Sequence, residues 1–344
     1  MVVLADRTAG EPPDAGGVVR CWDRPDWEID VATAAGGVRP DVVHIQHGAH
    51  FGDGESTVRL ARALRKQGIP LVVTLHDVYP SSLFRPQPRR FHQALGDAAS
   101  RIIVHQAAGS VPVLKGHGVP DDKIEVVPHG TNEDGSIEQQ LARRQLGLAS
   151  ETPIVLFLGF IFRRKGVHTI VKAFSRVARE LPQARLVIAG ELRHRYWSDG
   201  TYHRWLARRL RAGRTTGWLD YRPGHVPEEL LRVYIAAADV VVFPYNRAYG
   251  SSSGVFHRTL AAGRAAMCSR CPTFGEAEEA WAQDLPEVFV DPGDPAAWAR
   301  AMIQLLQDEG LRARAAAAAS TLGRRSAWSE VADRHMQVYR SVRD

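Results

Sequence analysis

Short, almost continuously apolar runs alternate with longer segments of mixed polarity along most of this chain. Such runs are typical of strands buried on both faces of a parallel sheet, and apolar residues at helical spacing predict the helices that cover it. In the first part we expect strands over residues 41–46, 71–75, 101–105 and 124–128, and helices over 56–67 and 91–98. This order predicts a doubly wound α/β domain.

The alternation stops at the polar residues 130–151, which we interpret as a linker with a short helix over 139–146, and then resumes. The later strands are expected over 153–160, 185–189, 239–244 and 265–269. The later helices are expected over 166–180, 202–211, 254–262, 295–308, 311–319 and after 328. We therefore predict two doubly wound domains, 1–135 and 136–326, and a final helix within 327–344. Ligands of such sheets bind at the carboxyl ends of the strands, so a cleft between the domains is the expected site.

The beginning of the chain departs from this pattern. Residues 1–5 and 18–22 resemble short strands and 27–35 a weak helix, but residues 6–17 are too polar and proline-broken for the helix that should follow a first central strand. A sheet without its central strand would expose two edges. We therefore favour a true start upstream, or a noncovalent substitute for the strand, over a pared-down domain.

Composition limits the class of protein. The 344 residues carry 44 Lys and Arg against 38 Asp and Glu, a net charge of +6, and 44% are hydrophobic, which excludes wholesale disorder. The mild positive charge permits anionic ligands without indicating nucleic acid. No apolar run approaches the roughly 20 residues of a membrane span, and no secretion signal is recognisable. These features predict a soluble, cytoplasmic protein.

Two segments place groups suited to an anion at the start of a helix. Residues 159–166 follow a strand and contain Arg163, Arg164 and Lys165, and residues 249–255 follow the strand that ends at 244 and contain three serines. Backbone N–H groups at helix starts, small residues and cationic side chains all suit phosphates. Each segment alone fits a solvated basic turn or an ordinary serine cap equally well. Together they favour a diphosphate site.

The chain resembles the retaining GT-B glycosyltransferases of the family 4 type. The resemblance is carried, in order, by residues 41–47, 72–77, 126–130, 159–166, 184–190, 225–231, 236–245 and 253–255. It implies two Rossmann-like domains that face a cleft, with a last helix that crosses back to the first domain. It also implies transfer of a sugar from a nucleotide-diphosphate sugar to a small hydroxylated or glycan acceptor, with retention and without a metal or further cofactor.

The resemblance also implies roles for individual residues. His76, near the donor sugar, and Lys165, on the diphosphate, would be the catalytic residues. The diphosphate would be bound by Gly159, Arg163, Arg164, Lys165, Ser252, Ser253, Gly254 and Val255. The nucleobase and ribose would lie at Arg222, Gly224, His225 and Arg258. The acceptor or sugar side would include His47, Asp77, His129 and Glu276.

Three positions depart from the family pattern. The two usual glutamates of the family are replaced here by Gly250 and Arg258, and its usual arginine, five residues before Lys165, is replaced by Phe160. Arg258 reverses the charge at the ribose position and suits a phosphate or a carboxylated sugar. Glu276 is a candidate to replace one of the lost carboxylates as a hydrogen-bond acceptor. The losses leave open a noncatalytic homologue that binds a nucleotide or a partner protein as a scaffold.

Three further features have structural explanations that compete with functional ones. Cys268 and Cys271 have redox or zinc spacing without a second pair, which favours a structural thiol pair. His44 and His47 lie three apart on a strand and point to opposite faces, so we expect a structural His44 and a cleft-lining His47. The arginines between 193 and 214 favour a solvated helix face over a nucleic-acid or membrane surface.

Overall fold

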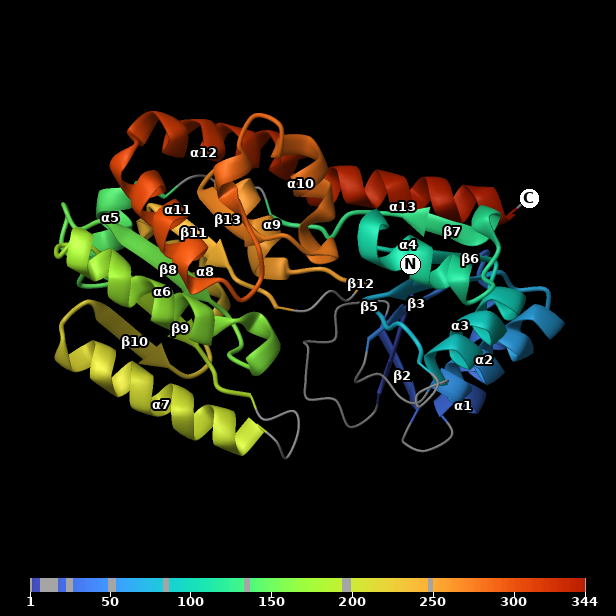
Figure 1. The fold of residues 1–344 in the computed structure, drawn as a ribbon. Helices are drawn as coiled ribbons and strands as arrows, with labels where there is room; N and C mark the ends of the chain where they lie inside the picture. The colour runs from blue at the N-terminus through green and yellow to red at the C-terminus, as the bar shows by residue number, and fades with distance from the viewer. Residues whose placement is uncertain are drawn as a thin grey trace. The chain divides into compact units, whose positions relative to one another are not determined.

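The computed structural model describes residues 2–6, 18–22, 27–48, 54–82, 87–132, 137–193, 199–246 and 250–343 (Figure 1). The chain divides into two compact units. The first comprises Met1–Val127, Tyr249–Ser252 and Ala332–Asp344, and the second comprises Pro128–Ala248 and Ser253–Val331. The division thus falls after residue 127, whereas the boundary was expected after residue 135.

The first unit contains a four-stranded parallel sheet in the order β3-β4-β6-β7. Its strands are β3 (Val43–His47), β4 (Leu71–Leu75), β6 (Arg101–Val104) and β7 (Ile124–Val126). All five residues of β4 are buried, as the apolar pattern predicts for a central strand. The four predicted strands are confirmed, with ends that shift by at most two residues.

Within the described residues of the first unit before β7, four helices accompany this sheet. They are α1 (Trp27–Val38), α2 (Gly54–Lys66), α3 (Gln87–Ala98) and α4 (Ala107–Gly116). Figure 1 shows α1, α2 and α3 side by side. The pattern did not predict α4, because Pro112 lies inside it and interrupts the usual helix signal. The Gln106 side chain begins this helix by accepting a hydrogen bond from the Gly109 N–H at 2.8 Å.

The predicted strands at the start of the chain form a sheet of their own. β1 (Val3–Asp6) and β2 (Val18–Trp22) pair in parallel. Among the described strands, β3 pairs only with β4, so β3 is an edge of the four-stranded sheet. A second small sheet joins β5 (Asp77–Val78) to β12 (Gly250–Ser251) in antiparallel register. The segment 7–17 lies outside the described residues.

The second unit is built on a six-stranded parallel sheet in the order β10-β9-β8-β11-β13-β14. The strands are β8 (Ile154–Leu158), β9 (Arg185–Gly190), β10 (Leu219–Pro223), β11 (Val240–Phe243), β13 (Ala265–Ser269) and β14 (Phe289–Val290). Two of them were not predicted. Polar residues interrupt β10, and β14 has two residues. The strand order reverses between β8 and β11, as in dinucleotide-binding folds.

The helices of the second unit are α5 (Gln139–Gln145), α6 (Val167–Glu180), α7 (Asp199–Thr215), α8 (Glu228–Ala237), α9 (Gly254–Ala261), α10 (Gly275–Trp281), α11 (Pro295–Gln307) and α12 (Glu309–Arg324). The pattern missed α8 and the short α10. The last helix, α13 (Trp328–Arg343), begins in the second unit and ends in the first. There Tyr339 Oη lies 2.6 Å from His44 Nδ1, and Arg343 pairs with Asp41 at 3.2 Å.

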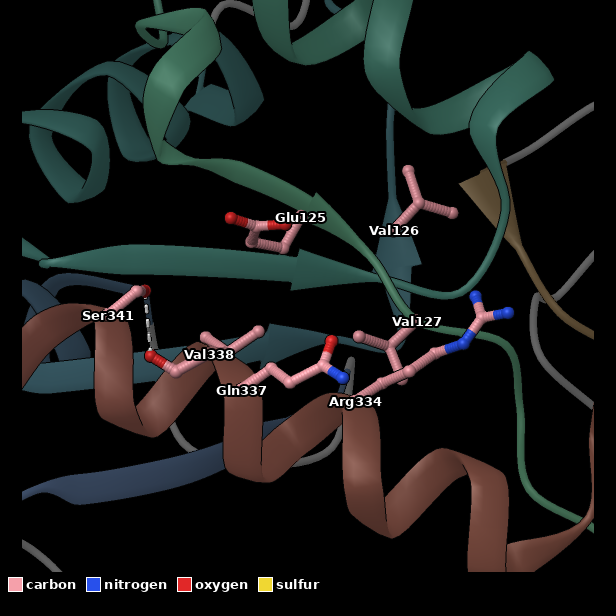
Figure 2. A pocket seen from close by; sticks show the side chains of 7 residues that line it. All are labelled: Glu125, Val126, Val127, Arg334, Gln337, Val338 and Ser341. Atoms are coloured by element: carbon pink, nitrogen blue, oxygen red, sulfur yellow. Dashed lines mark hydrogen bonds between the residues drawn. The ribbon is translucent and has the colours of Figure 1, made fainter.

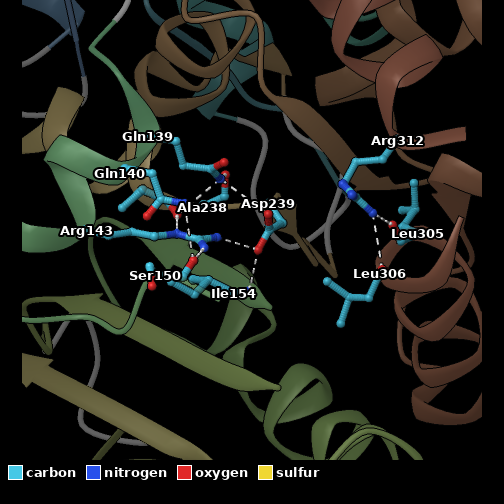
Figure 3. Close-up of polar contacts among 11 residues, drawn as sticks. Gln139, Gln140, Arg143, Ser150, Ile154, Ala238, Asp239, Leu305, Leu306 and Arg312 are labelled. Atoms are coloured by element: carbon cyan, nitrogen blue, oxygen red, sulfur yellow. Dashed lines mark hydrogen bonds and ion pairs between the residues drawn. The ribbon is translucent and has the colours of Figure 1, made fainter. Parts of the chain in front are cut away.

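A buried ion pair anchors α5 within the second unit (Figure 3). The Arg143 guanidinium donates to Asp239 Oδ2 at 2.8 Å, to the Ala237 carbonyl at 3.0 Å and to the Ser150 carbonyl. The same Asp239 oxygen accepts the Ile154 N–H at 2.6 Å, where β8 begins. The polar segment interpreted as a linker is therefore partly a structural element that ties α5 to the central strands.

Candidate functional site

The basic segment and the last residues of the serine-containing segment lie at the point where the strand order of the second unit reverses. Residues 159–166 follow β8, residues 253–255 come after β11, and these two parallel strands are hydrogen-bonded neighbours. Ligands of open parallel sheets bind outside the carboxyl ends of the strands at this reversal. The sheet therefore brings together two segments that are about 90 residues apart in the sequence.

The basic segment forms a 3-10 turn, Arg163–Lys165, that is anchored to the residues after β11. The Asn246 backbone N–H donates to the Arg164 carbonyl at 2.9 Å, and its side-chain amide donates to the Arg163 carbonyl at 3.0 Å. Gly166 ends the turn with φ of 70°, and a Cβ there would lie 1.6 Å from the Pro244 carbonyl oxygen. Only glycine allows this close approach.

A buried tyrosine connects the basic turn to the start of α9. Lys165 Nζ lies 3.6 Å from the centroid of the Tyr245 ring, within cation–π range. The Tyr245 hydroxyl is 2.7 Å from the Oγ of Ser253, the residue that precedes α9. Burial raises the pKa of Tyr245 well above its usual value, so this hydroxyl keeps its proton. Tyr245 thus holds a cation and a helix N-terminus in one arrangement.

Glycines lie at the ends of the two strands beside this arrangement, Gly159 directly after β8 and Gly190 as the last residue of β9. Gly159 has φ of 117°, and a Cβ there would lie 3.6 Å from Val255 in α9. Gly190, at the end of β9, has φ of 154°, and a Cβ there would lie 1.9 Å from the Gly159 carbonyl oxygen. The bare backbone and the positive end of α9 suit an anion.

Most of the residues expected to bind a diphosphate therefore belong to one region of the second unit. These are Gly159, Arg163, Arg164, Lys165, Ser253, Gly254 and Val255. Ser252 groups with the first unit. Sequence reasoning missed Tyr245 and Asn246, although both immediately follow a predicted strand, where ligand-site residues of parallel sheets are usually found.

The residues expected at the nucleobase have different surroundings. The Arg222 guanidinium donates to Asp220 at 2.7 Å and 2.9 Å and to the Leu146 carbonyl at 2.9 Å, so it is engaged within the unit. Gly224 and His225 are exposed after β10. Their backbone groups are the better candidates for ligand contacts.

Arg258 forms an ion pair with Glu228 at the start of α8. It also lines a small pocket of about 30 Å³ with Thr131, Asn132, Arg232, Ile235, Ala261 and Ala262. The reversed charge expected from Arg258 is thus partly neutralised by a carboxylate from another helix. Sequence reasoning missed Glu228 because the two residues meet only through the packing of α8 on α9.

Two of the four residues expected on the acceptor or sugar side, His129 and Glu276, lie in the second unit. His129 contacts the start of α9, because a Cβ on Gly254 would lie 3.6 Å from its ring, and it stacks on His257 with centroids 5.5 Å apart. Burial lowers the pKa of His129, which favours a neutral ring. Glu276 is exposed in the first turn of α10.

The remaining candidates lie in the first unit. Gln46 Oε1 accepts a hydrogen bond from His76 Nε2 at 2.8 Å, and His76 Nδ1 lies 3.1 Å from His105 Nε2. Asp77 follows in β5. His47 points to the other face of β3, where it is 9% exposed, packs against Phe91 and lies 3.2 Å from Thr57 Oγ1. The structure therefore groups His76 with His105 and Gln46, which sequence reasoning did not single out.

A groove of about 410 Å³ lies between β7 and α13 in the first unit (Figure 2). It is lined by Glu125, Val126, Val127, Arg334, Gln337, Val338 and Ser341, and it contains none of the residues expected to bind substrate.

Both cysteines of the 268–271 pair are buried, and burial raises the pKa of each thiol, in agreement with a structural role. Within the described ranges, no helix has the length and apolar character needed to cross a bilayer.

Two family models match the chain. The model described as glycosyl transferases group 1 matches residues 152–308, and the model described as Glycosyltransferase Family 4 matches residues 7–134. A D-inositol 3-phosphate glycosyltransferase of Xylanimonas cellulosilytica is 29% identical over 80% of this chain and 67% of its own length. One of Corynebacterium urealyticum is 30% identical over 75% and 60%. The chain thus spans about two thirds or less of the length of these relatives.

Similar solved structures include Anabaena HepE in complex with UDP, with a TM-score of 0.73, 18% identity and coverage of 92% of this chain and 81% of that one. Sucrose-phosphate synthase from Thermosynechococcus elongatus has a TM-score of 0.73, 20% identity and coverage of 92% and 77%. At this level of identity the likeness shows the fold. The expected GT-B class, with its two parallel-sheet α/β domains, is confirmed.

Proposed function

Because the chain belongs to the group 1 and family 4 glycosyltransferases, we propose that it moves a sugar from a nucleotide-diphosphate sugar to a small hydroxylated acceptor with retention of configuration. The observation that carries the proposal is the arrangement of Lys165, Tyr245 and Ser253 beside the start of α9. HepE, which shares the fold, has been solved with UDP and with UDP-glucose, so a nucleotide-sugar donor suits this architecture.

In this proposal the second unit stabilises the leaving group. The bond between the anomeric carbon and the diphosphate oxygen breaks, and the diphosphate leaves with the electron pair. Lys165, the arginines of its turn and the backbone N–H groups of α9 stabilise the growing negative charge. The acceptor oxygen attacks the anomeric carbon on the same face, and its proton passes to the departing phosphate. No metal or further cofactor is part of the proposal.

The relatives indicate which acceptor to test first. Those named above are D-inositol 3-phosphate glycosyltransferases, so a phosphorylated cyclitol is the first acceptor to test. The phosphate of such an acceptor suits a positively charged side chain, such as an arginine or a protonated histidine. Other hydroxylated acceptors, including glycans, form the second set.

The donor site is tested by thermal shift with uridine, guanosine, adenosine and thymidine diphosphates and their common sugar conjugates. Selective binding to the native state raises the melting temperature by mass action. We expect a shift with one base. A folded chain that no member of the panel stabilises would overturn the proposal. Binding of the nucleotide sugar without turnover of any acceptor would favour the scaffold alternative, which the absence of carboxylates at Gly250 and Arg258 supports.

Replacing Lys165 with alanine is expected to weaken diphosphate binding by about 1.5–3 kcal/mol, the usual scale for a hydrogen bond to a charged group. Isothermal titration calorimetry of the full chain measures this change. Lys66→Ala removes an exposed lysine of α2 in the first unit and is the matched control, with unchanged affinity expected. Equal affinities of the Lys165 and Lys66 variants would remove Lys165 from the site.

Tyr245 offers a second test of the same arrangement. Tyr245→Phe keeps the ring beneath Lys165 and loses the hydrogen bond to Ser253, whereas Tyr245→Leu loses both. We expect the leucine variant to bind the diphosphate more weakly than the phenylalanine variant by about 0.5–2 kcal/mol, the range of cation–π interactions. Titration well below each variant's melting temperature separates this effect from stability. Equal binding by the two variants would show that the ring does not position Lys165.

A further inference from the structure

A continuous chain of hydrogen bonds connects three strands of the first unit with α13. His105 Nδ1 donates to the Val127 carbonyl at 3.0 Å, and its Nε2 lies 3.1 Å from His76 Nδ1. His76 Nε2 lies 2.8 Å from Gln46 Oε1, and Gln46 Nε2 lies 3.3 Å from His44 Nε2. These contacts decide where protons sit, because carbonyl and amide oxygens accept hydrogen bonds and cannot donate them.

The two ends of the His76–His105 pair each require a bound proton. The Val127 carbonyl requires an N–H at His105 Nδ1, and Gln46 Oε1 requires an N–H at His76 Nε2. The contact between the rings then requires a third proton, on either His105 Nε2 or His76 Nδ1. Two neutral imidazoles carry two ring protons between them. This pattern of contacts therefore corresponds to a pair with one extra proton.

A neutral pair must break the pattern at one of three places. A break between the rings leaves both His105 Nε2 and His76 Nδ1 without a proton, so that two lone pairs face each other at 3.1 Å, which is unfavourable. In the first of the other two arrangements His105 Nδ1 has no proton, and its lone pair faces the Val127 carbonyl oxygen at 3.0 Å. Val127 is 2% exposed and His105 is 9% exposed, so water does not readily replace the lost hydrogen bond. A buried carbonyl and a buried ring nitrogen would then oppose each other, which is unfavourable.

In the second neutral arrangement the Gln46 amide is reversed and donates to His76 Nε2. Its oxygen then faces His44 Nε2, which must carry a proton and donate to Gln46 and Thr74. Thr74 is fully buried, and His44 Nε2 is its side chain's hydrogen-bond partner among the described residues, at 2.8 Å. When His44 Nε2 is bare, it accepts the proton of the Thr74 hydroxyl. A protonated His44 Nε2 cannot accept it, so the Thr74 hydroxyl would lose this acceptor.

His44 supports the charged arrangement from its own side. Burial lowers the pKa of His44 to about 4, so this ring is neutral at pH 7. Its Nε2 then accepts from Thr74 and Gln46, and its Nδ1 donates to the Tyr339 hydroxyl at 2.6 Å. Every hydrogen bond in the series from Val127 to Tyr339 is satisfied in this state, with the Gln46 amide oriented as the structure has it.

We propose that His76 and His105 share one extra proton at pH 7, so that the carboxyl edge of the first unit's sheet carries a fixed positive charge. Among the described residues, the titratable groups in this part of the unit include His44 and His47 on β3, Asp77 on β5, and His335 and Tyr339 on α13. Asp77 is the carboxylate of this set, and it directly follows His76.

The shared proton changes the role expected of His76. With Nε2 held by Gln46 and Nδ1 held by His105, the ring has no bare nitrogen with which to accept a proton from an acceptor hydroxyl. It acts instead as a positive charge that attracts an anionic group, and His105 is the positioning residue that sustains this charge. This role rests on the proposed function, whereas the protonation state is a property of the first unit alone.

The test is a long-range ¹H–¹⁵N NMR spectrum of the ¹⁵N-histidine-labelled, ligand-free full chain at pH 7, with assignments from His76→Gln and His105→Gln. The proposal predicts that His105 Nδ1 and His76 Nε2 each carry a proton and that a third proton is shared between His105 Nε2 and His76 Nδ1. Two rings that each show one bare nitrogen would overturn it. Because no nucleotide or acceptor is present, a failed diphosphate titration leaves this result unaffected.

The first unit contains an internal control. His92 and His117 also lie side by side, with 2.7 Å between their Nδ1 atoms, but the far partner of His117 is the Ser81 hydroxyl, which can donate or accept. Burial lowers the pKa of His92 to about 3 and also lowers that of His117. We expect this pair to be neutral in the same spectrum.

Variants of the exposed Gln46 extend the test without disturbing the core. Gln46→Glu supplies an oxygen that only accepts, so the third proton should remain at pH 7. Gln46→Met supplies no strong acceptor, so the pair should lose its extra proton at that pH. An unchanged proton count in the methionine variant would show that Gln46 does not set the charge and would contradict the proposal.

Discussion

Replacing Arg143 with alanine is expected to lower the free energy of unfolding by about 3–5 kcal/mol, the scale for breaking a buried ion pair from one side. The Arg143 side chain is 5% exposed and that of Asp239 is 17% exposed. Removing the guanidinium leaves the Asp239 carboxylate with a weaker set of donors and frees the Ala237 and Ser150 carbonyls. The loss loosens α5 from the start of β8.

Urea unfolding of the full chain, followed by far-UV circular dichroism, measures this change. Arg144 is the next residue on the same helix and is exposed, so Arg144→Ala is the matched control, with a change within about 0.5 kcal/mol expected for a surface substitution. If both variants unfolded at the same urea concentration, the Arg143 network would have no net stabilising role.

Gly166→Ala is expected to disrupt the basic turn as well as the fold around it. Left-handed backbone costs a residue with a Cβ about 1–2 kcal/mol. The new methyl would also lie 1.6 Å from the Pro244 carbonyl oxygen, and overpacking of this kind typically costs about 1–3 kcal/mol more. Relief of the overlap must move the turn that carries Lys165. We therefore expect lower stability and weaker diphosphate binding together.

Gly217→Ala separates the two causes. Gly217 has a similar φ of 79°, but a Cβ there would meet nothing within 4 Å. Its variant should show only the backbone cost, about 1–2 kcal/mol, with unchanged diphosphate affinity. Thermal unfolding and calorimetric titration of the two variants provide the comparison. Equal stability losses would mean that contact with Pro244 is unimportant.

The apolar runs predicted the strands well because a strand buried on both faces must be apolar at nearly every position. β4 and β13 were predicted with their observed bounds. The misses have local reasons. Pro112 obscured α4, and the polar residues Asp220 and Arg222 obscured β10. The 130–151 segment looked like a linker because its anchor, Arg143, is a polar residue whose partner lies 96 positions away.

The candidate site was predicted unevenly for a similar reason. The glycines and cations after β8 and the serines before α9 carry recognisable local chemistry, so the sequence identified both. It gave no means of foreseeing that Tyr245 lies beneath Lys165, that Glu228 pairs with Arg258, or that His105 lies beside His76. Each pair joins different elements.

The sequence by itself determined the alternation of strands and helices, the α/β class and the two helix starts suited to phosphate. These follow from periodicity, backbone conformation and side-chain type, which act over a few neighbouring residues. Only the tertiary structure decided that Asn246 anchors the basic turn and that Gln46 faces His76. Partner, orientation and proton position depend on groups that approach through space, and hydrogen bonds are sensitive to tenths of an ångström.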